Sequence, residues 1–323
     1  MTSSAMKALG NFKPVLKGAL TWIPGVQRAF YDRTAAGGTA EVRYCYRVWI
    51  KHLSLLWQAG MRTLPTAVAE LGPGKSLGTG LAALLSGAER YAAIDVVRHA
   101  SVATTAPLLE PMAELFRERA PCPPRGFPDY SDVLDARLFP SQILTDERLG
   151  RALDTARVAE IGDAARRLDA KEQHPWLRYA TRGDSAAVTE GKVDLLFSHV
   201  VLGLAQDLEA MYECCARWLK PGAWTSHLVD FTSHNITSAW NGHLQYSDAV
   251  WRVIAGQRPF FPNRVQLSGH LALMEKYGFE VVSVQRSRGT DGIERSQLAP
   301  RWRDISEDDL TCAHAFIVAR KRG

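Results

Sequence analysis

The densest group of side chains suited to proton transfer lies between residues 227 and 248. Histidines in such a group could remove the proton from a reacting hydroxyl, and His234 and His243 are the first candidates for a general base. Alternatively, Asp230 and these two histidines could hold a divalent cation that acidifies a hydroxyl, an interpretation that we do not favour. A third interpretation is a polar loop that only caps backbone groups. The group comprises His227, Asp230, His234, Asn241, His243 and Asp248.

A second group of polar residues follows two expected strands. Residues 67–70 form a short apolar strand pattern that ends on Glu70, and an apolar helix is expected over 76–86. Between them, Gly72 and Gly74 allow a tight turn and a close approach of the backbone to a ligand. A second strand is expected over 91–94, directly before Asp95. This order is half of a nucleotide-binding α/β unit, whose ligand lies at the carboxyl ends of the strands.

The type of nucleotide follows from the residues around the turn. A dinucleotide site needs a third glycine where Leu77 stands. The carboxylate of Glu70 would also repel a pyrophosphate, so it suits a ligand with an amino group and no phosphate. S-adenosylmethionine is such a ligand. Glu70 would face its methionine end, Gly72 and Gly74 would make room for it, and Asp95 would accept both ribose hydroxyls.

The stretch AELGPGKSLGTGLAALLSGA, with Asp95 after it, resembles motif I and the acidic motif of class I S-adenosylmethionine-dependent methyltransferases. The resemblance implies a seven-stranded, Rossmann-like α/β sheet with S-adenosylmethionine as cofactor. Ser76 stands where the family often has a third glycine. The cofactor contacts that follow are Glu70, Gly72, Gly74, Ser76, Asp95, Asp184 after a third strand, and Ser198 at the end of a fourth; Asp184 could equally be an exposed loop aspartate.

Later segments fit the same family. The run VDLLFS (193–198) resembles its motif IV, but Gly203 and Leu204 occupy the places of its usual Glu-His pair, which argues against a catalytic residue there. The run LKPGAW (219–224) predicts a Pro-Gly turn into a fifth strand at 224–231. Strands expected at 279–284 and 313–319 would form the terminal hairpin of this fold.

We expect an N-terminal basic arm and helical cap over residues 1–66 and a methyltransferase domain over 67–323, with a helical insert at about 100–175. The cap helix spans 41–62, where apolar residues recur at helical spacing. Its Tyr44 could cover the cofactor cleft and contact substrate. The alternative is that this stripe of apolar residues only packs in the core.

The acceptor pocket is expected after the fifth strand. Trp240 and Phe260 could stack on a sugar or another ring, and polar residues beside them could bind it: Asn241, Asn263 and Arg264. The chain is also similar to a narrower group of bacterial methyltransferases often associated with polysaccharide biosynthesis, through RYCYRVWIKHL, FPSQILTDERL, SHLVDF, WNGH and NR. That resemblance implies methylation of a sugar oxygen. The rival functions are a nicotinamide-dependent sugar enzyme and a non-catalytic cofactor-binding protein.

Composition sets further bounds. The 323 residues carry a formal net charge of +5, of which residues 1–35 supply +4 through five basic residues and one aspartate, so no nucleic-acid partner is required. This basic segment either packs on the domain or makes a weak membrane-surface contact. The five cysteines are odd in number and lack C-x-x-C spacing, which favours the reducing cytoplasm. The partner expected is a small-molecule or glycan acceptor, and the oligomeric state stays open.

Overall fold

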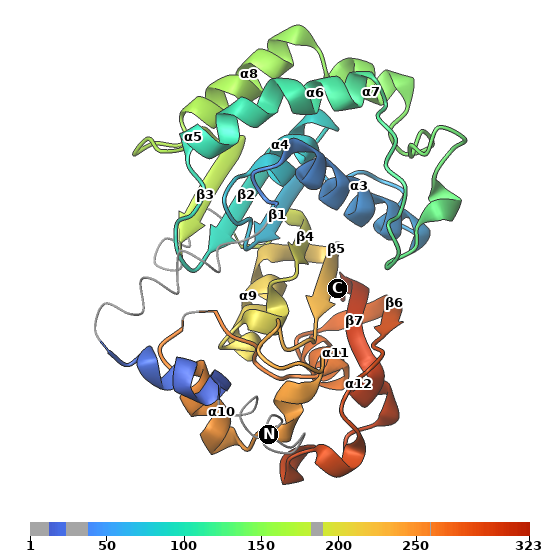
Figure 1. Cartoon of the computed structure of the whole chain (residues 1–323). Coiled ribbons are helices and arrows are strands. Elements are labelled where there is room, and N and C mark those ends of the chain that lie inside the picture. Colours follow the sequence, from blue (N-terminus) through green and yellow to red (C-terminus); the bar gives the residue numbers. More distant parts are fainter. Residues whose placement is uncertain (1–12, 24–37, 182–189, 259) are drawn as a thin grey trace.

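The computed structural model describes residues 13–23, 38–181, 190–258 and 260–323. Its centre is a seven-stranded sheet with the strand order β3-β2-β1-β4-β5-β7-β6 (Figure 1). The strands are β1 (Ala67–Leu71), β2 (Arg90–Asp95), β3 (Leu177–Thr181), β4 (Val193–His199), β5 (Leu219–Asp230), β6 (Phe279–Arg288) and β7 (Cys312–Lys321).

The pairing of the strands defines the fold. β1 lies between β2 and β4 and is parallel to both, and β5 is parallel to β4. β7 is antiparallel and lies between β5 and β6. The strand order therefore reverses at β1, and the carboxyl ends of β1, β2, β4 and β5 meet at one edge, where α/β sheets bind their ligands. The predicted seven-stranded Rossmann-like sheet with a terminal hairpin is confirmed.

Helices cover both faces of the sheet, so its strands are buried on both sides. Val68 of β1 joins one hydrophobic cluster, whereas its neighbour Ala69 joins the other. Helices α3 to α8 lie together beside β1, β2 and β3 in Figure 1. The helices are α3 (Val42–Gln58), α4 (Gly78–Leu85), α5 (Val102–Thr105), α6 (Leu109–Arg117), α7 (Asp146–Ala152), α8 (Thr155–Arg166), α9 (Leu208–Trp218), α10 (Asp248–Ala255), α11 (Leu267–Lys276) and α12 (Glu307–Thr311).

Helix α3 and helices α4 to α8 form one helical layer, and the role of α3 as a cap over a cofactor stays a prediction. The hydroxyl of Tyr46 in α3 donates to the carbonyl of Ala120, 2.9 Å away, and the indole of Trp49 donates to Ser86 over 2.7 Å. Both side chains are buried. Helix α3 is therefore part of the main core, where it also carries Tyr44 toward the carboxyl end of β1.

The predicted Pro-Gly turn before the fifth strand is wrong. β5 already begins at Leu219, and its pairing with β4 shifts register between Val193 and Leu195. Gly222 has a φ of +74°, which lets the strand bulge at this point. A Pro-Gly pair fits a bulge as well as a turn, because proline removes one ladder hydrogen bond in either case.

The polar segment between β6 and β7 contains short 3₁₀ turns at Arg295–Gln297 and Pro300–Trp302 and the helix α12. β6 extends to Arg288, and α12 precedes β7 directly. The segment carries its own small hydrophobic cluster with residues of the loop after β5: Leu244, Leu298, Ala299, Trp302 and Leu310. None of the helices in the described ranges is both long and apolar enough to span a bilayer.

Candidate functional site

The turn after β1 has the tight backbone conformation that Gly72 and Gly74 predicted. Gly72 and Gly74 have φ angles of +65° and +79°, which side-chain-bearing residues rarely adopt. The amide of Gly72 donates to the carbonyl of Ile94, 2.8 Å away, and so ties the turn to β2. A Cβ on Gly72 would lie 2.6 Å from a methyl of Val201, in the loop after β4. The turn is therefore closely packed between the ends of β2 and β4.

Glu70 lies beneath this turn and is buried, with 3% of its surface exposed. The hydroxyl of Tyr91 donates to its carboxylate. Burial raises the pKa of Glu70 to about 8, and the negative charge of Asp95 adds to the rise, whereas the Tyr91 hydrogen bond opposes it. Gly80 makes room for the Tyr91 ring, since a Cβ there would lie 2.4 Å from it. Tyr91 was missed because its hydrogen bond depends on strand pairing.

Asp95 ends β2 beside the same turn. One carboxylate oxygen accepts the amide of Val96 over 2.7 Å, and the backbone amides of Val97 and Gly74 also favour its ionised form. Burial nevertheless raises the pKa of Asp95. The structure thus brings Glu70, Gly74 and Asp95 together, as the sequence predicted.

Two other expected cofactor contacts, Ser76 and Ser198, form side-chain hydrogen bonds within the protein. The hydroxyl of Ser76 donates to the carbonyl of Thr39 and accepts the amide of Gly78 over 3.1 Å. The hydroxyl of Ser198 lies 2.8 Å from Nδ1 of His227. Both serines are buried, so we reassign them from ligand contacts to supports of the turn and the strand end. Asp184 lies outside the described residues.

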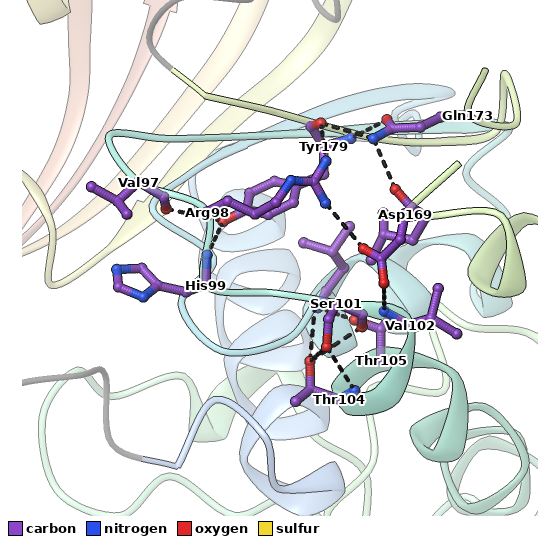
Figure 2. Close-up of polar contacts among 12 residues, drawn as sticks. Val97, Arg98, His99, Ser101, Val102, Thr104, Thr105, Asp169, Gln173 and Tyr179 are labelled. Carbon is purple, nitrogen blue, oxygen red and sulfur yellow. Dashed lines mark hydrogen bonds and ion pairs between the residues drawn. The ribbon is translucent and has the colours of Figure 1, made fainter. Parts of the chain in front are cut away.

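The loop after Asp95 is braced by residues of β3 and the insert, as Figure 2 shows. The hydroxyl of Tyr179 accepts the amide of His99 over 2.9 Å and donates to the carbonyl of Val97 over 3.2 Å. Asp169 accepts hydrogen bonds from Arg98 and from the amide of Val102, at 3.2 and 2.9 Å. These bonds hold the backbone of residues 97–102 at the carboxyl end of β2.

Two predicted substrate residues, Phe260 and Tyr44, lie near the loop after Asp95 and near Glu70. The Phe260 ring centre is 6.1 Å from that of His99. Tyr44 is half-buried, and its ring meets that of His199 edge-on at 6.2 Å. The pKa of Tyr44 is raised to about 12, chiefly by burial and also by the charge of nearby Glu70. Tyr44 is thus near Glu70, as a residue covering the cleft must be.

Asp230, at the carboxyl end of β5, lies between two histidines. Its carboxylate oxygens are 3.8 Å from Nε2 of His234 and 3.7 Å from Nε2 of His314. These distances suit ion pairs but are too long for hydrogen bonds. His234 has a φ of +48°, which places it in a tight turn after the strand. Sequence reasoning missed His314, because only the pairing of β5 with antiparallel β7 sets it opposite Asp230.

His243 lies deeper, beside a hollow of about 180 Å³ that Asp230 and Arg264 also line. Its Nδ1 has no hydrogen-bond partner within the described part of the chain. Burial, helped by the positive charges of Arg264 and His234, lowers the pKa of His243 to about 3. His243 is therefore a neutral and weak base.

No cluster of three or more histidine, cysteine or acidic residues in the described ranges is arranged to hold a metal ion. The interpretation of Asp230, His234 and His243 as a cation site thus finds no ligand set there.

The polar groups of two predicted substrate residues are occupied by the backbone. The amide of Asn241 donates to the carbonyls of Ile293 and Leu310, and its oxygen accepts the amide of Ile293 over 2.6 Å. Asn263 donates to two carbonyls, at 2.8 and 2.9 Å, and accepts the amide of Val265. The nitrogen and oxygen of each side-chain amide are thus bonded within the protein and brace the loops after β4, β5 and β6. Substrate contacts by Asn241 and Asn263 stay predictions, and Asn263 also lines the hollow beside His243.

Trp240 and Arg264 also have structural partners. A Cβ on Gly289 would lie 2.2 Å from the Trp240 indole, so Trp240 packs tightly under the turn after β6. Arg264 is 6% exposed, donates to the carbonyl of Tyr246 over 2.7 Å and pairs with Asp248. Arg264 nevertheless lines the hollow, so a substrate contact there stays a prediction.

A buried chain of polar side chains was not foreseen. Nδ1 of His52 in α3 lies 2.7 Å from the hydroxyl of Ser226, and its Nε2 lies 3.1 Å from Nδ1 of His199. Burial lowers the pKa of His199 to about 3. The chain ends at His199, at the carboxyl end of β4 next to β1. Nearby, Gly203 replaces the expected acidic residue because a Cβ there would lie 2.4 Å from the carbonyl oxygen of Asp230.

No protein-family model matches the chain, and neither does any curated protein. Among solved structures, it is similar to an S-adenosylmethionine-dependent methyltransferase from Mesorhizobium loti at 12% identity, with a TM-score of 0.40 over 83% of this chain and 96% of that one. A SAM-dependent methyltransferase from Methanosarcina mazei shows 11% identity and a TM-score of 0.41 over 83% and 97%.

Phosphoethanolamine N-methyltransferase 2 from Haemonchus contortus, in complex with S-adenosyl-L-methionine, shows 13% identity and a TM-score of 0.43 over 92% of this chain and 60% of that one. Scores this low carry no argument of their own. The fold assignment stands on the strand order and on the antiparallel β7 between β5 and β6. By that order, the chain has the fold of the class I S-adenosylmethionine-dependent methyltransferases.

Proposed function

We propose that this protein is an S-adenosylmethionine-dependent methyltransferase that methylates an oxygen of a small hydroxylated acceptor such as a sugar. The observation that carries the proposal is the pair of buried carboxyl groups at the adjacent ends of β1 and β2. Glu70 and Asp95 flank the Gly72–Gly74 turn at the point where the strand order reverses. In open α/β sheets this is the position of the ligand.

The charge at this position favours a cationic donor over a dinucleotide. A pyrophosphate beside the turn would lie against Glu70 and would oppose ionisation of its carboxyl group, whereas Asp95 at the end of β2 suits the ribose of either ligand. The ammonium group of S-adenosylmethionine would instead draw Glu70 into its ionised form, because a nearby positive charge lowers the pKa of a carboxyl group. Asp95 would accept hydrogen bonds from the ribose hydroxyls. The donor supplies the methyl group as an electrophile on its sulfonium.

We place the acceptor next to the carboxyl ends of β4 and β5. Neighbouring strands are about 4.8 Å apart, so the end of β5 lies about 10 Å from the end of β1. His234 turns its Nε2 toward Asp230, at 3.8 Å. The carboxylate would orient this imidazole so that its other ring nitrogen can take the hydroxyl proton. We assign His234 as the base and Asp230 as its partner, and we assign the neutral His243 to shaping the pocket.

Most of the rate would come from holding donor and acceptor in line, since methyl transfer to an oxygen is a direct displacement. Tyr44 and Phe260 are near the donor end and would close over the two substrates. All five cysteines are free thiols, which supports work in a reducing compartment such as the cytoplasm.

The proposal is tested by incubating the purified protein with methyl-labelled S-adenosylmethionine and a panel of sugars, nucleotide sugars and phenols. We expect transfer of the label to at least one hydroxylated acceptor, with equal formation of S-adenosylhomocysteine. Binding of the donor without transfer to any acceptor would instead indicate a non-catalytic cofactor-binding protein.

A further inference from the structure

Residues 13–20 form a helix that packs on α10 with its small side chains. A Cβ on Gly18 would lie 2.2 Å from the carbonyl oxygen of Val253, so the two backbones are almost in contact. The hydroxyl of Thr21 donates to the carbonyl of Gly18 over 2.6 Å and accepts the amide of Gln257 over 2.9 Å. Figure 1 shows this dark blue helix beside α10. The segment is thus docked through glycine and threonine.

The large apolar side chains of the same segment face outward. Leu16 is 65% exposed and Trp22 is 60% exposed, although the sequence places both in an apolar pattern. The same segment also packs apolar residues inward, since Pro14 is buried and Val15 contacts the cluster around Trp251, so its exposed large side chains are apolar surface that the fold leaves uncovered. We call this exposed set the apolar shelf, and it consists of Leu16, Leu20, Trp22 and Ile23.

The charge around the apolar shelf is positive. Lys13 and Lys17 are exposed on the helix that carries Leu16, and residues 13–23 contain no acidic residue. The first 35 residues carry a net charge of +4, from five basic residues and one aspartate. The nearest acidic side chain of α10, Asp248, is paired with Arg264 and Arg301. Within residues 13–23 and α10, the one acidic side chain is therefore already paired with arginines, which favours a negatively charged partner.

We propose that the apolar shelf docks on the surface of a membrane that contains anionic lipids. Leucine and tryptophan side chains would enter the boundary between headgroups and acyl chains while the lysines contact lipid phosphates. A protein partner would not require the combination of outward leucines, an interfacial tryptophan and uncompensated lysines on one short helix. Binding through so small a surface is reversible and weakens as salt screens the lysines.

The test is co-sedimentation of the full chain with phosphatidylcholine vesicles, with and without phosphatidylserine. It uses no methyl donor, so its outcome is independent of the proposed enzyme activity. The apolar variant is Leu16→Ser with Leu20→Ser, and the charge variant is Lys13→Glu with Lys17→Glu. Val282→Ser is the matched control, because Val282 is 40% exposed on β6, outside the apolar shelf. Circular dichroism checks that each variant is folded.

We expect the native protein and the Val282→Ser control to sediment with anionic vesicles, and far less with phosphatidylcholine alone. The apolar and charge variants should each bind about tenfold more weakly. The proposal is overturned if the native protein stays in the supernatant with anionic vesicles, or if the apolar variant binds like the control. It is equally overturned if the native protein forms a dimer that the apolar variant abolishes, since the shelf would then join two copies of this chain.

Discussion

The candidate site has a donor end, at the carboxyl ends of β1 and β2, and an acceptor end, at the carboxyl ends of β4 and β5. The two ends use their polar groups differently. At the donor end, Glu70 and Asp95 are buried carboxyl groups whose pKa values are both raised by burial. At the acceptor end, several polar side chains are bonded within the protein, as with Asn263 and its two carbonyl partners. The donor end therefore holds carboxyl groups that a cationic ligand can draw into their ionised form, whereas the acceptor end consists mostly of bracing around one histidine–aspartate pair.

The comparison also shows what burial does to acids and bases. It raises the pKa of Glu70 to about 8 and lowers that of His243 to about 3, so both groups are largely neutral near pH 7. Glu70 can regain its charge when a cation arrives. Burial outweighs the opposing charge of Asp230 at His243, so His243 is a poor base, and His234 is the better candidate because it is less buried and has Nε2 3.8 Å from Asp230.

The largest expected effect is at the acceptor end. Replacing His234 with alanine should lower the rate of methyl transfer by about 10²–10⁴-fold, the usual contribution of a general base. The affinity for S-adenosylmethionine should stay unchanged, because the donor binds at β1 and β2. Assays of S-adenosylhomocysteine formation measure the first quantity and calorimetry the second. His174→Ala, in the helical insert where His174 contacts Glu160, is the matched control. Equal losses in both variants would remove His234 from the mechanism.

The next effect is on stability at the donor end. The folded-state pKa of Glu70, about 8, lies above the ordinary glutamate value of 4.5, so folding favours the protonated form. Its contribution to stability is full below about pH 4.5 and is lost as the pH rises toward 8, on the order of 3–5 kcal/mol in all. Urea unfolding between these pH values should show this decline in the native protein and a smaller one in Glu70→Gln.

The exposed Glu275→Gln serves as the matched control for that experiment and should decline like the native protein. If Glu70→Gln lost stability with pH as steeply as this control, the buried carboxyl group would not be protonated in the folded state.

Asp95→Ala should weaken binding of S-adenosylmethionine by about ten- to a hundredfold, since hydrogen bonds to a charged group contribute about 1.5–3 kcal/mol. Calorimetric titration measures the change, and Asp304→Ala, at an exposed position, is the control. An unchanged dissociation constant for the Asp95 variant would end the assignment of ribose binding to this residue.

The smallest effect expected is at Asn263. Asn263→Ala leaves two carbonyls and one amide without their partner, which should lower the free energy of unfolding by about 1–3 kcal/mol. Donor affinity should not change. Thermal unfolding with and without S-adenosylhomocysteine separates the two quantities. A variant of native stability that fails to methylate would support Asn263 as a substrate contact.

The donor end could be predicted because its signals are local. The apolar run, the glycine turn and the terminal carboxylates of β1 and β2 lie within about 30 residues, and Glu70, Gly72, Gly74 and Asp95 do converge. The start of β5 was predicted wrongly because a Pro-Gly pair is compatible with both a turn and a β-bulge.

The acceptor end depends on contacts between distant residues. His52 meets His199 across 147 positions, and Asn241 meets Leu310 across 69. Sequence spacing showed His52 only as part of a helical stripe, and it showed Asn241 only as a polar residue in a loop. The residues next to Asn241 in the sequence do not show that its amide bonds to the backbone of a distant segment. The sequence therefore located the polar cluster at residues 227–248 but did not show what each side chain does there.

The most direct test of the donor site is calorimetric titration of the purified protein with S-adenosylmethionine, S-adenosylhomocysteine and NAD, at about pH 6 and pH 7, where the amino group of the ligand is still charged. We predict micromolar binding of the first two ligands and none of NAD. Their affinity should increase nearly tenfold over that pH unit as Glu70 ionises, and this increase should be absent in Glu70→Gln. Binding of NAD alone would contradict the assignment of Glu70, and with it the proposed methyl transfer.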